Sequence, residues 1–592
     1  MHLALLVDGR LIGSRYALVT VEFLITLVLL AAAMFFPHAC AASFRAIESK
    51  LRLVAGRRVL CAGALFTFVI GARLLLLPVV PIPSPNIHDE FSYLLAADTF
   101  SSGRVTNPPH RFWDSFETVH VLQQPTYMSM YPPLQGLFLA FGQGVLGNPW
   151  LGVCISVGLM VVAIFWMLSG WFSPEIALVG SVLVAVRCGI FSYWMNSYWG
   201  GAPSALGGAL ILGSIPRLVR AFRVRDATAF ALGLCLLANS RPYEGLIVSV
   251  AAIVGLAVWP RRYSLPFREQ LAQRFLRVLL VPLLLVMLCA ALTYFYNRQV
   301  TGEGLRLPYV LDRTQYATAP LLSFLPLRPE PYFRDEALRR VYAEEVGLYR
   351  KARYKWGLPE AARKVKEIWL FFVGPLLTLP FITSLAMARK RRDHRCVFFA
   401  FVLLVILAGL LLEVWFYPHY AAPAMAALVA LILLGLQKMR SWNWGGRPSG
   451  LFLARSLPLG CVFLTILPIS ASLLGLPLAS WPLQWYGGTR EKLHEDTTFR
   501  QLGIEGQKDL VFVRYGPTSR AGDGEWISNR ADIDHSAVIW ARDKGPVRNL
   551  ELVRYFSRRR FWLFQPDRRP WQISPYDPAR TAANGPPESV RR

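Results

Sequence analysis

Long apolar runs are the feature of this sequence that most constrains its fold. A helix needs about 20 apolar residues to cross a bilayer, and only 17% of the residues are charged, against about 25% in soluble domains. The sequence therefore predicts a mainly α polytopic membrane protein with about twelve transmembrane helices. We expect them near residues 16–37, 59–80, 149–169, 175–195, 201–216, 227–240, 245–259, 275–297, 369–388, 396–413, 419–437 and 456–479.

The net charge of +26 comes from 63 basic against 37 acidic residues, and its distribution predicts the topology. Basic residues concentrate in some loops, and the positive-inside rule places those loops in the cytoplasm. The remaining loops are acidic, mixed or aromatic, which places them outside. For the spans to alternate, segment 132–147 has to lie on the outer surface as an interfacial helix. The basic loops are 44–58, 217–225, 261–277, 389–395 and 438–447.

Dispersed basic loops also exclude a nucleic-acid partner and leave membrane lipid as the expected one. The eight cysteines include no CxxC pair, so a disulfide or zinc framework is not expected.

Three parts follow from this topology. Residues 1–58 form an N-terminal transmembrane helix and a basic cytoplasmic linker; the apolar run is longer than that of a signal peptide, so we expect the helix to be retained. Residues 59–480 form the membrane domain, with outer loops at 81–148 and 298–367. Residues 481–592 form a small extracytoplasmic α/β domain with a frayed end. In it 509–515, 536–542 and 560–566 are typical of strands, and 549–556 is typical of a helix.

Two adjacent carboxylates, Asp89 and Glu90, follow the second span and precede an apolar, helix-like stretch. Acidic residues at such a position often cap a helix, because its first N–H groups are free and its dipole is positive there. A carboxylate at the outer mouth of a span can equally take a proton from a reacting hydroxyl. The two interpretations have about equal weight on these residues alone.

The surrounding motif favours the second interpretation. Arg73 ends the second span, DExxYLxxA follows with Tyr93, and Tyr131 opens YPPL before the next helix. This pattern resembles the GT-C glycosyltransferases, which include protein O-mannosyltransferases and lipid A aminoarabinose transferases. Where that family often has Lys or His before PPL, this sequence has Tyr131.

The resemblance implies a GT-C-like membrane domain in a bacterial inner membrane, with its active site on the periplasmic face. It implies a polyprenyl-phosphate-linked sugar as donor and a glycan, lipid or protein as acceptor. Asp89 would be the base, and Glu90 would orient the acceptor or tune the electrostatics. The substrate-lining residues implied are His88, Tyr93 and Tyr131.

A leaving lipid phosphate requires cationic or hydrogen-bonding partners. The outward-facing candidates are Arg241 and the pair His419 and Tyr420, with Arg187 deeper in a span. The alternatives are a local salt bridge of Arg241 with Glu244, and an interfacial position for His419. For Arg187 no partner can be named, and Glu22 in the first span is likewise unexplained.

Aromatic and small residues at the outer turn 196–208 could stack against a sugar ring, although an aromatic belt at the interface explains them as well. The lining candidates there are Asn196, Tyr198 and Trp199, with Glu244 nearby. In the second outer loop, Tyr309, Asp312, Tyr316 and Tyr332 could line an acceptor cleft.

No metal site is assigned, because three ligands in the ADIDH segment (531–535) fit a turn better. A divalent cation at the carboxylates stays an alternative. Two other functions stay open, a lipid-linked glycan ligase or polymerase and a transporter or flippase, although we see no internal repeat of the transporter kind.

Overall fold

The computed structural model describes residues 17–85, 87–258, 265–354, 358–390, 393–473, 499, 501–504, 506–516, 525–568 and 571–577. The chain packs into two compact units, each built from three separate segments. Unit 1 comprises Met1–Pro83, Trp150–Leu292 and Lys355–Thr489. Unit 2 comprises Ser84–Pro149, Thr293–Tyr354 and Arg490–Arg592.

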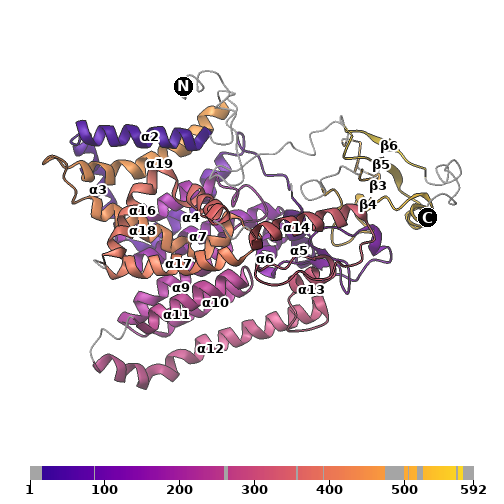
Figure 1. Ribbon diagram of the computed structural model, residues 1–592, viewed down its shortest axis with the longest axis horizontal. Coiled ribbons are helices and arrows are strands. Elements are labelled where there is room, and N and C mark those ends of the chain that lie inside the picture. The colour runs from indigo at the N-terminus through magenta and orange to yellow at the C-terminus, as the bar shows by residue number, and fades with distance from the viewer. Residues whose placement is uncertain are drawn as a thin grey trace. The chain divides into compact units, whose positions relative to one another are not determined.

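Unit 1 is helical (Figure 1). Its α-helices are α2 (Ala17–Phe35), α3 (Ala41–Ala55), α4 (Arg58–Leu75), α7 (Pro149–Trp171), α8 (Pro174–Val184), α9 (Ala202–Arg220), α10 (Val224–Ala238), α11 (Pro242–Val258), the first part of α12 (Leu265–Thr301), α15 (Leu358–Ile368), α16 (Gly374–Arg389), α17 (His394–Leu412), α18 (Met425–Met439) and α19 (Ser449–Leu473). Shorter π and 3₁₀ turns are η2 (Ala185–Ile190), η4 (Trp369–Val373) and η5 (Pro418–Ala424).

Among the described residues, nine helical segments are long and apolar enough to cross a membrane. They confirm the predicted integral membrane protein. In the most apolar part of Pro418–Met439, 94% of the residues are buried inside the protein. In the corresponding part of Val278–Thr301, within α12, only 11% of the residues are buried. Residues 474–479 of the last predicted span lie outside the described part of the chain.

The other three predicted spans correspond to shorter helices in the described part of the chain, and the number of about twelve stays a prediction. α8 has 11 residues before the chain turns into η2, α10 has 15 residues and α11 has 17. Short helices and irregular backbone are tolerated at membrane depth where protein covers them. Residues 185–199, which follow α8, are buried throughout.

Unit 2 combines helices with two small sheets. Its α-helices are α5 (His88–Ser101), α6 (Pro133–Leu146), α13 (Pro308–Tyr316), α14 (Glu336–Tyr354) and α20 (Pro546–Tyr555). Strands β1 (Val121–Leu122) and β2 (Met128–Ser129) pair antiparallel. α6 confirms the helix expected at 132–147.

The second sheet of unit 2 has the order β4-β3-β5-β6. β3 (Asp509–Val513) pairs in parallel with β4 (Val538–Arg542) and β5 (Arg560–Phe564), and β6 (Ile573–Pro575) pairs antiparallel with β5. The three strands and the helix predicted for this segment are confirmed. The strands are short continuous apolar runs, and all five residues of β3 are buried. Residues 481–498 and the predicted frayed end from 578 lie outside the described residues.

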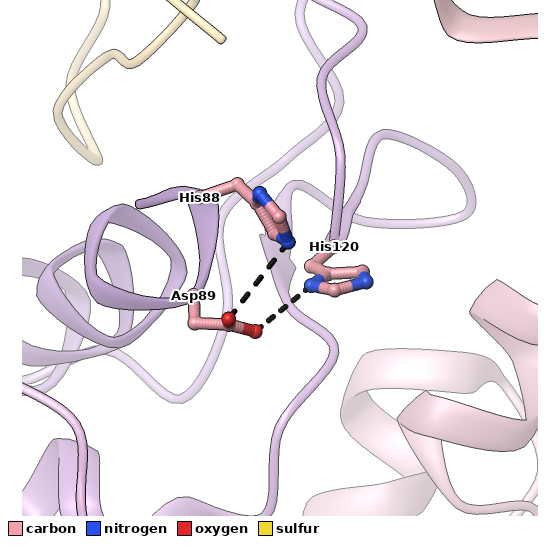
Figure 2. A group of neighbouring side chains, drawn as sticks. All are labelled: His88, Asp89 and His120. Carbon is pink, nitrogen blue, oxygen red and sulfur yellow. Dashed lines mark hydrogen bonds and ion pairs between the residues drawn. The ribbon is translucent and has the colours of Figure 1, made fainter. Parts of the chain in front are cut away.

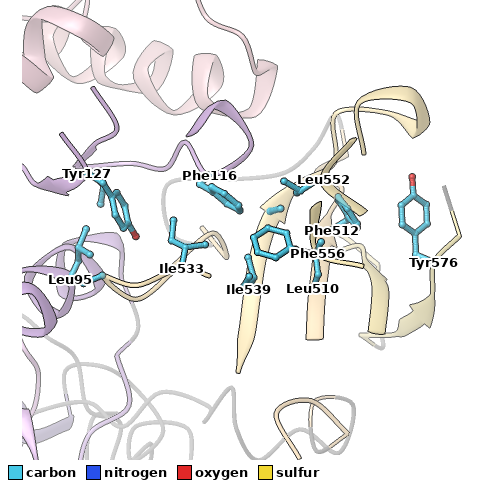
Figure 3. Packing of buried hydrophobic residues seen from close by; sticks show 13 residues of the cluster. Leu95, Phe116, Tyr127, Leu510, Phe512, Ile533, Ile539, Leu552, Phe556 and Tyr576 are labelled. Atoms are coloured by element: carbon cyan, nitrogen blue, oxygen red, sulfur yellow. The ribbon is translucent and has the colours of Figure 1, made fainter. Parts of the chain in front are cut away.

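One hydrophobic core joins this sheet to the first outer loop (Figure 3). Leu95 of α5 and Phe116 belong to the same buried cluster as Leu510 and Phe512 of β3. The fully buried Arg542 of β4 donates to the carbonyl of Glu117 at 2.6 Å. The segments that the sequence analysis separates as two outer loops and a C-terminal domain therefore fold as one body.

Arg542 also ties the second outer loop to this body. Its Nη1 lies 3.1 Å from Asp335 Oδ1, and its Nη2 lies 2.6 Å from Glu525 Oε2. A buried guanidinium is tolerated only when its donors are paired in this way.

Candidate functional site

The two adjacent carboxylates occupy the first turn of α5 and have different environments. Glu90 is buried, and its Oε2 accepts a hydrogen bond from the N–H of Ile87 at 3.2 Å. This contact is a helix cap, which satisfies one of the free N–H groups at the helix start. Asp89 instead turns toward side chains from outside the helix.

Asp89 lies in a group with His88, His120 and Tyr131, which we call the Asp89 cluster (Figure 2 shows the first three). Its Oδ1 lies 3.0 Å from His120 Nδ1 and also accepts a hydrogen bond from the Tyr131 hydroxyl. Its Oδ2 lies 3.8 Å from His88 Nε2. Oδ1 is thus held by two neighbours, and Oδ2 is the oxygen better placed to meet a substrate.

His120 holds an unusual backbone conformation, with φ at 62° in the left-handed region. The Oγ of Ser92 donates to its carbonyl at 2.7 Å, and the N–H of Met130 donates to the same carbonyl at 3.3 Å. A non-glycine residue held in this region costs free energy, and such residues cluster at functional sites. In this conformation the imidazole Nδ1 of His120 lies within hydrogen-bond distance of Asp89.

Electrostatics keeps the Asp89 carboxylate charged. Burial alone raises the pKa of Asp89, but the charge of His88 and hydrogen bonds from His120 and Tyr131 outweigh it, so the pKa lies below its usual value. Burial, together with the charge of His88, lowers the pKa of His120 despite the opposing effect of Asp89. At neutral pH the cluster therefore holds an ionised carboxylate beside a neutral imidazole.

Tyr131 is positioned by Tyr93, because the two rings stack with centroids 4.4 Å apart. The Tyr131 hydroxyl also lies 2.9 Å from His120 Nδ1. Tyr131, the residue before PPL, thus points its phenol at the carboxylate of Asp89.

A small pocket adjoins the Asp89 cluster within unit 2. Its wall carries polar groups from the start of α5 and from the segment before β4, next to apolar side chains. The lining residues are His88, Phe91, Leu95, Thr118, Val119, Val121, Tyr127, Glu525, Ile527, Ser528 and Asn529.

The cluster also has the composition of a metal site. One ligand atom from each of His88, Asp89 and His120 lies within 4.8 Å of the others. Two imidazoles and a carboxylate suit a transition-metal ion such as zinc. These three residues would hold a divalent cation, the alternative that the sequence leaves open.

A second group of predicted residues lies in unit 1, around His419 of η5. His419 Nδ1 lies 2.8 Å from the Tyr193 hydroxyl, and the His419 ring packs edge-on to Trp199 with centroids 4.8 Å apart. The guanidinium of Arg241 lies 4.1 Å above the ring of Tyr420. The structure thus brings together Trp199, Arg241, His419 and Tyr420, which the sequence places far apart.

Arg241 also forms the local contact that the sequence offers as its alternative role. Its Nη1 lies 3.2 Å from Glu244 Oε1. About a fifth of the Arg241 side chain is exposed, whereas Glu244 is buried. Glu244 therefore orients a guanidinium that still reaches the surface.

Asn196 and Tyr198 form hydrogen bonds that hold the segment after α4. Arg73 Nε donates to Asn196 Oδ1 at 3.0 Å, and Arg73 also donates to the carbonyls of Val80 and Pro81. The Tyr198 hydroxyl donates to the Pro83 carbonyl at 3.0 Å. These contacts fix the chain that leads from α4 toward residue 84.

Arg187 and Glu22, the two charges that the sequence leaves unexplained, pair with each other. Arg187 Nη1 lies 2.9 Å from Glu22 Oε1, and both side chains are buried. Glu22 also accepts a hydrogen bond from the N–H of Leu376 at 3.2 Å. The pair therefore links α2, η2 and the start of α16.

The proposed acceptor-cleft residues divide between interior and surface. Tyr332 is exposed, whereas Asp312 of α13 is completely buried. Tyr316 donates to Glu117 Oε1 at 3.2 Å. In the ADIDH segment, Asp532 pairs with His535, but Asp534 faces His110 at 3.0 Å, so its three candidate ligands point to different partners.

Asp312 predicts a pH-dependent stability. Among the described residues neither of its carboxylate oxygens has a hydrogen-bond partner, and burial raises its pKa to about 7. The folded state therefore binds this proton more tightly than the unfolded state, whose pKa is about 3.9. The contribution of Asp312 to stability is therefore greatest below about pH 4 and is lost as the pH rises to about 7.

We expect Asp312→Asn to raise the free energy of unfolding by about 1–3 kcal/mol at pH 8, and to change it little at pH 4. Thermal unfolding of both proteins across this pH range measures the difference. Parallel curves for the two proteins would contradict the assignment.

Comparison with known proteins gives one family match. Residues 227–522, half of the chain, match the family model described as TgpA N-terminal domain. A comparison with curated protein sequences gave no match.

Solved structures give weak likenesses. The Archaeoglobus fulgidus oligosaccharyltransferase in complex with Zn and sulfate has a TM-score of 0.44 at 12% identity, covering 84% of this chain and 67% of that chain. ArnT from Cupriavidus metallidurans in the apo state has a TM-score of 0.45 at 12% identity, covering 84% and 92%. The same ArnT bound to undecaprenyl phosphate has a TM-score of 0.37 at 12% identity, covering 69% and 73%. At this level, likeness does not decide the reaction that this chain carries out.

Proposed function

This chain belongs to the TgpA N-terminal domain family, and we propose that it is an integral membrane glycosyltransferase. It transfers a sugar from a polyprenyl-phosphate donor to an acceptor hydroxyl on the outer, periplasmic face of the membrane. The observation that carries this proposal is the position of the Asp89 carboxylate, whose Oδ1 is held by His120 and Tyr131.

Asp89 acts as the general base. As the acceptor oxygen bonds to the anomeric carbon, its proton passes to Asp89 Oδ2 and the bond from that carbon to the phosphate oxygen breaks. The polyprenyl phosphate leaves with the bonding electrons. One base and a direct displacement invert the anomeric centre.

Arg241, His419 and Tyr420 of unit 1 stay the proposed partners of the donor phosphate, on the chemistry of their side chains. Arg241 presents a partly exposed guanidinium beside the Tyr420 hydroxyl-bearing ring. Charge-assisted hydrogen bonds to phosphate are among the strongest that a side chain offers. The ring of His419, which lies next to Tyr420 in the chain, is held by a hydrogen bond with the Tyr193 hydroxyl.

Detection of free polyprenyl phosphate tests the proposal. Purified protein, given a polyprenyl-phosphate sugar and an extract of envelope glycans, lipids and proteins, should release the lipid phosphate and glycosylate one acceptor class. A transporter or flippase moves the donor between leaflets and leaves the sugar–phosphate bond intact. Movement without bond cleavage would overturn the enzyme assignment.

Treatment with EDTA distinguishes a general base at Asp89 from a metal site at the same residues. If Asp89 acts as a base, activity should largely survive EDTA, because proton transfer to a carboxylate requires no cation. A loss that a divalent cation restores would instead assign His88, Asp89 and His120 as metal ligands. Donor turnover with and without added cation is the measurement.

Cysteine labelling tests the membrane orientation. A cysteine at position 310, in the second outer loop, should react with a membrane-impermeant maleimide in intact cells, and one at position 391 should react only after lysis. The positive-inside rule predicts this pattern. The reverse pattern would turn the topology over and move Asp89 to the cytoplasmic face.

A further inference from the structure

An exposed apolar loop in unit 2 has no role in the reaction proposed above. It consists of Phe324, Leu325, Pro326 and Leu327, which we call the 324–327 loop. The Phe324 side chain is 54% exposed, and Leu325 and Leu327 are 39% and 38% exposed. Single exposed apolar residues are ordinary, but three within four positions mark an interaction surface.

The loop is braced from the inside by the end of α14. Arg353 Nη1 donates to the carbonyls of Phe324 at 2.9 Å and Leu325 at 2.8 Å. The Tyr349 hydroxyl donates to the same Leu325 carbonyl at 2.7 Å. These two carbonyls are thus satisfied by protein donors, which lowers the cost of moving this part of the loop out of water.

Basic residues outnumber acidic ones beside the loop, and the nearest acidic residue that follows it, Glu330, pairs with Arg339. The sequence contains no Asp or Glu from Arg313 to Pro329, nor from Val346 to Pro359. Three basic side chains in these stretches are exposed: Arg328, Arg350 and Lys351. An apolar tip with a basic rim is the combination that binds an anionic lipid surface.

Chain connectivity links this surface to a predicted span. Tyr354, the exposed last residue of α14, precedes by about five residues the helical segment Pro359–Arg389. That segment begins with the charged helix α15 and becomes apolar from Ile368. The end of α14, and with it the loop that Arg353 holds, is therefore joined to the predicted span at 369–388 through one short helix.

We propose that the 324–327 loop docks into the adjacent lipid leaflet. Phe324 and Leu327 enter the boundary between headgroups and acyl chains, and Arg328, Arg350 and Lys351 contact lipid phosphates. The inference depends on the chain being a membrane protein and not on the reaction assigned to it.

A fluorescent label on Phe324→Cys tests the docking. The exposed Cys40 is first replaced by serine, and the labelled protein is placed singly in nanodiscs containing phosphatidylglycerol. The matched control is Val547→Cys, an exposed apolar position on α20 of the same unit. We expect blue-shifted emission at position 324, and quenching by nitroxide lipids several-fold stronger than at position 547.

Equal quenching at the two positions would show that the loop is in water and would overturn the proposal. Shielding of position 324 in detergent that grows with protein concentration would assign the loop to a second copy of the chain instead. Unchanged quenching in uncharged phosphatidylcholine nanodiscs would overturn the role given to the basic residues.

Discussion

Asp89→Asn should lower the rate of sugar transfer by at least about a hundredfold, since general bases contribute about 10²–10⁴ to rates. The amide keeps the size of the side chain and can still hydrogen bond to Tyr131, but it cannot take the acceptor proton. Because the pKa of Asp89 lies below its usual value, the wild-type rate should not fall through Asp89 protonation until the pH is well below 4.

The matched control is Asp114→Asn in the same outer loop, within the 3₁₀ turn η1 (Trp113–Ser115). It removes the same charge outside the Asp89 cluster and should leave turnover nearly unchanged. Donor binding, measured by quenching or thermal shift, should survive in both variants. Full turnover by Asp89→Asn would remove the carboxylate from the mechanism.

Arg187→Met should destabilise the protein by about 3–5 kcal/mol, because it leaves the Glu22 carboxylate buried without its partner. The double variant Glu22→Met/Arg187→Met removes both charges and should recover most of this loss, since apolar residues often replace a buried ion pair at little cost. Thermal unfolding in detergent measures both variants.

The same pair of variants tests whether Arg187 binds the donor phosphate. If Arg187 has only the structural role that its contact with Glu22 indicates, the double variant should regain the wild-type KM for the donor together with its stability. Recovered stability with a donor KM that stays raised would assign Arg187 to the donor site. The outcome thus distinguishes a structural role of Arg187 from a role in binding the donor phosphate.

The sequence predicts most elements of the fold because they depend on local pattern. Apolar runs of sufficient length locate the spans, and short continuous apolar runs locate β3, β4 and β5. Hydropathy alone does not distinguish a lipid-facing helix from one that protein covers. α8 illustrates this: it is apolar, but it ends after 11 residues where the chain turns into η2.

The candidate site was predicted only in part, for a physical reason. Asp89 and Tyr131 belong to a contiguous motif, but His120 meets Asp89 from 31 residues away, through a backbone conformation that no local pattern signals in a histidine. Tyr193 reaches His419 across 226 residues. Arg187 and Glu22 lie 165 residues apart, and only the packing of helices shows that two isolated charges neutralise each other.

The shared core of unit 2 has a consequence for biosynthesis. Leu95 and Phe116 are synthesised long before their partners Leu510 and Phe512. Domains usually fold as they are synthesised, N-terminal parts first, yet this core cannot close until the predicted spans between the two segments have been made. The loop that carries Asp89 therefore matures only after β3 has been synthesised, so a ribosome that stalls before β3 yields a protein without a finished site.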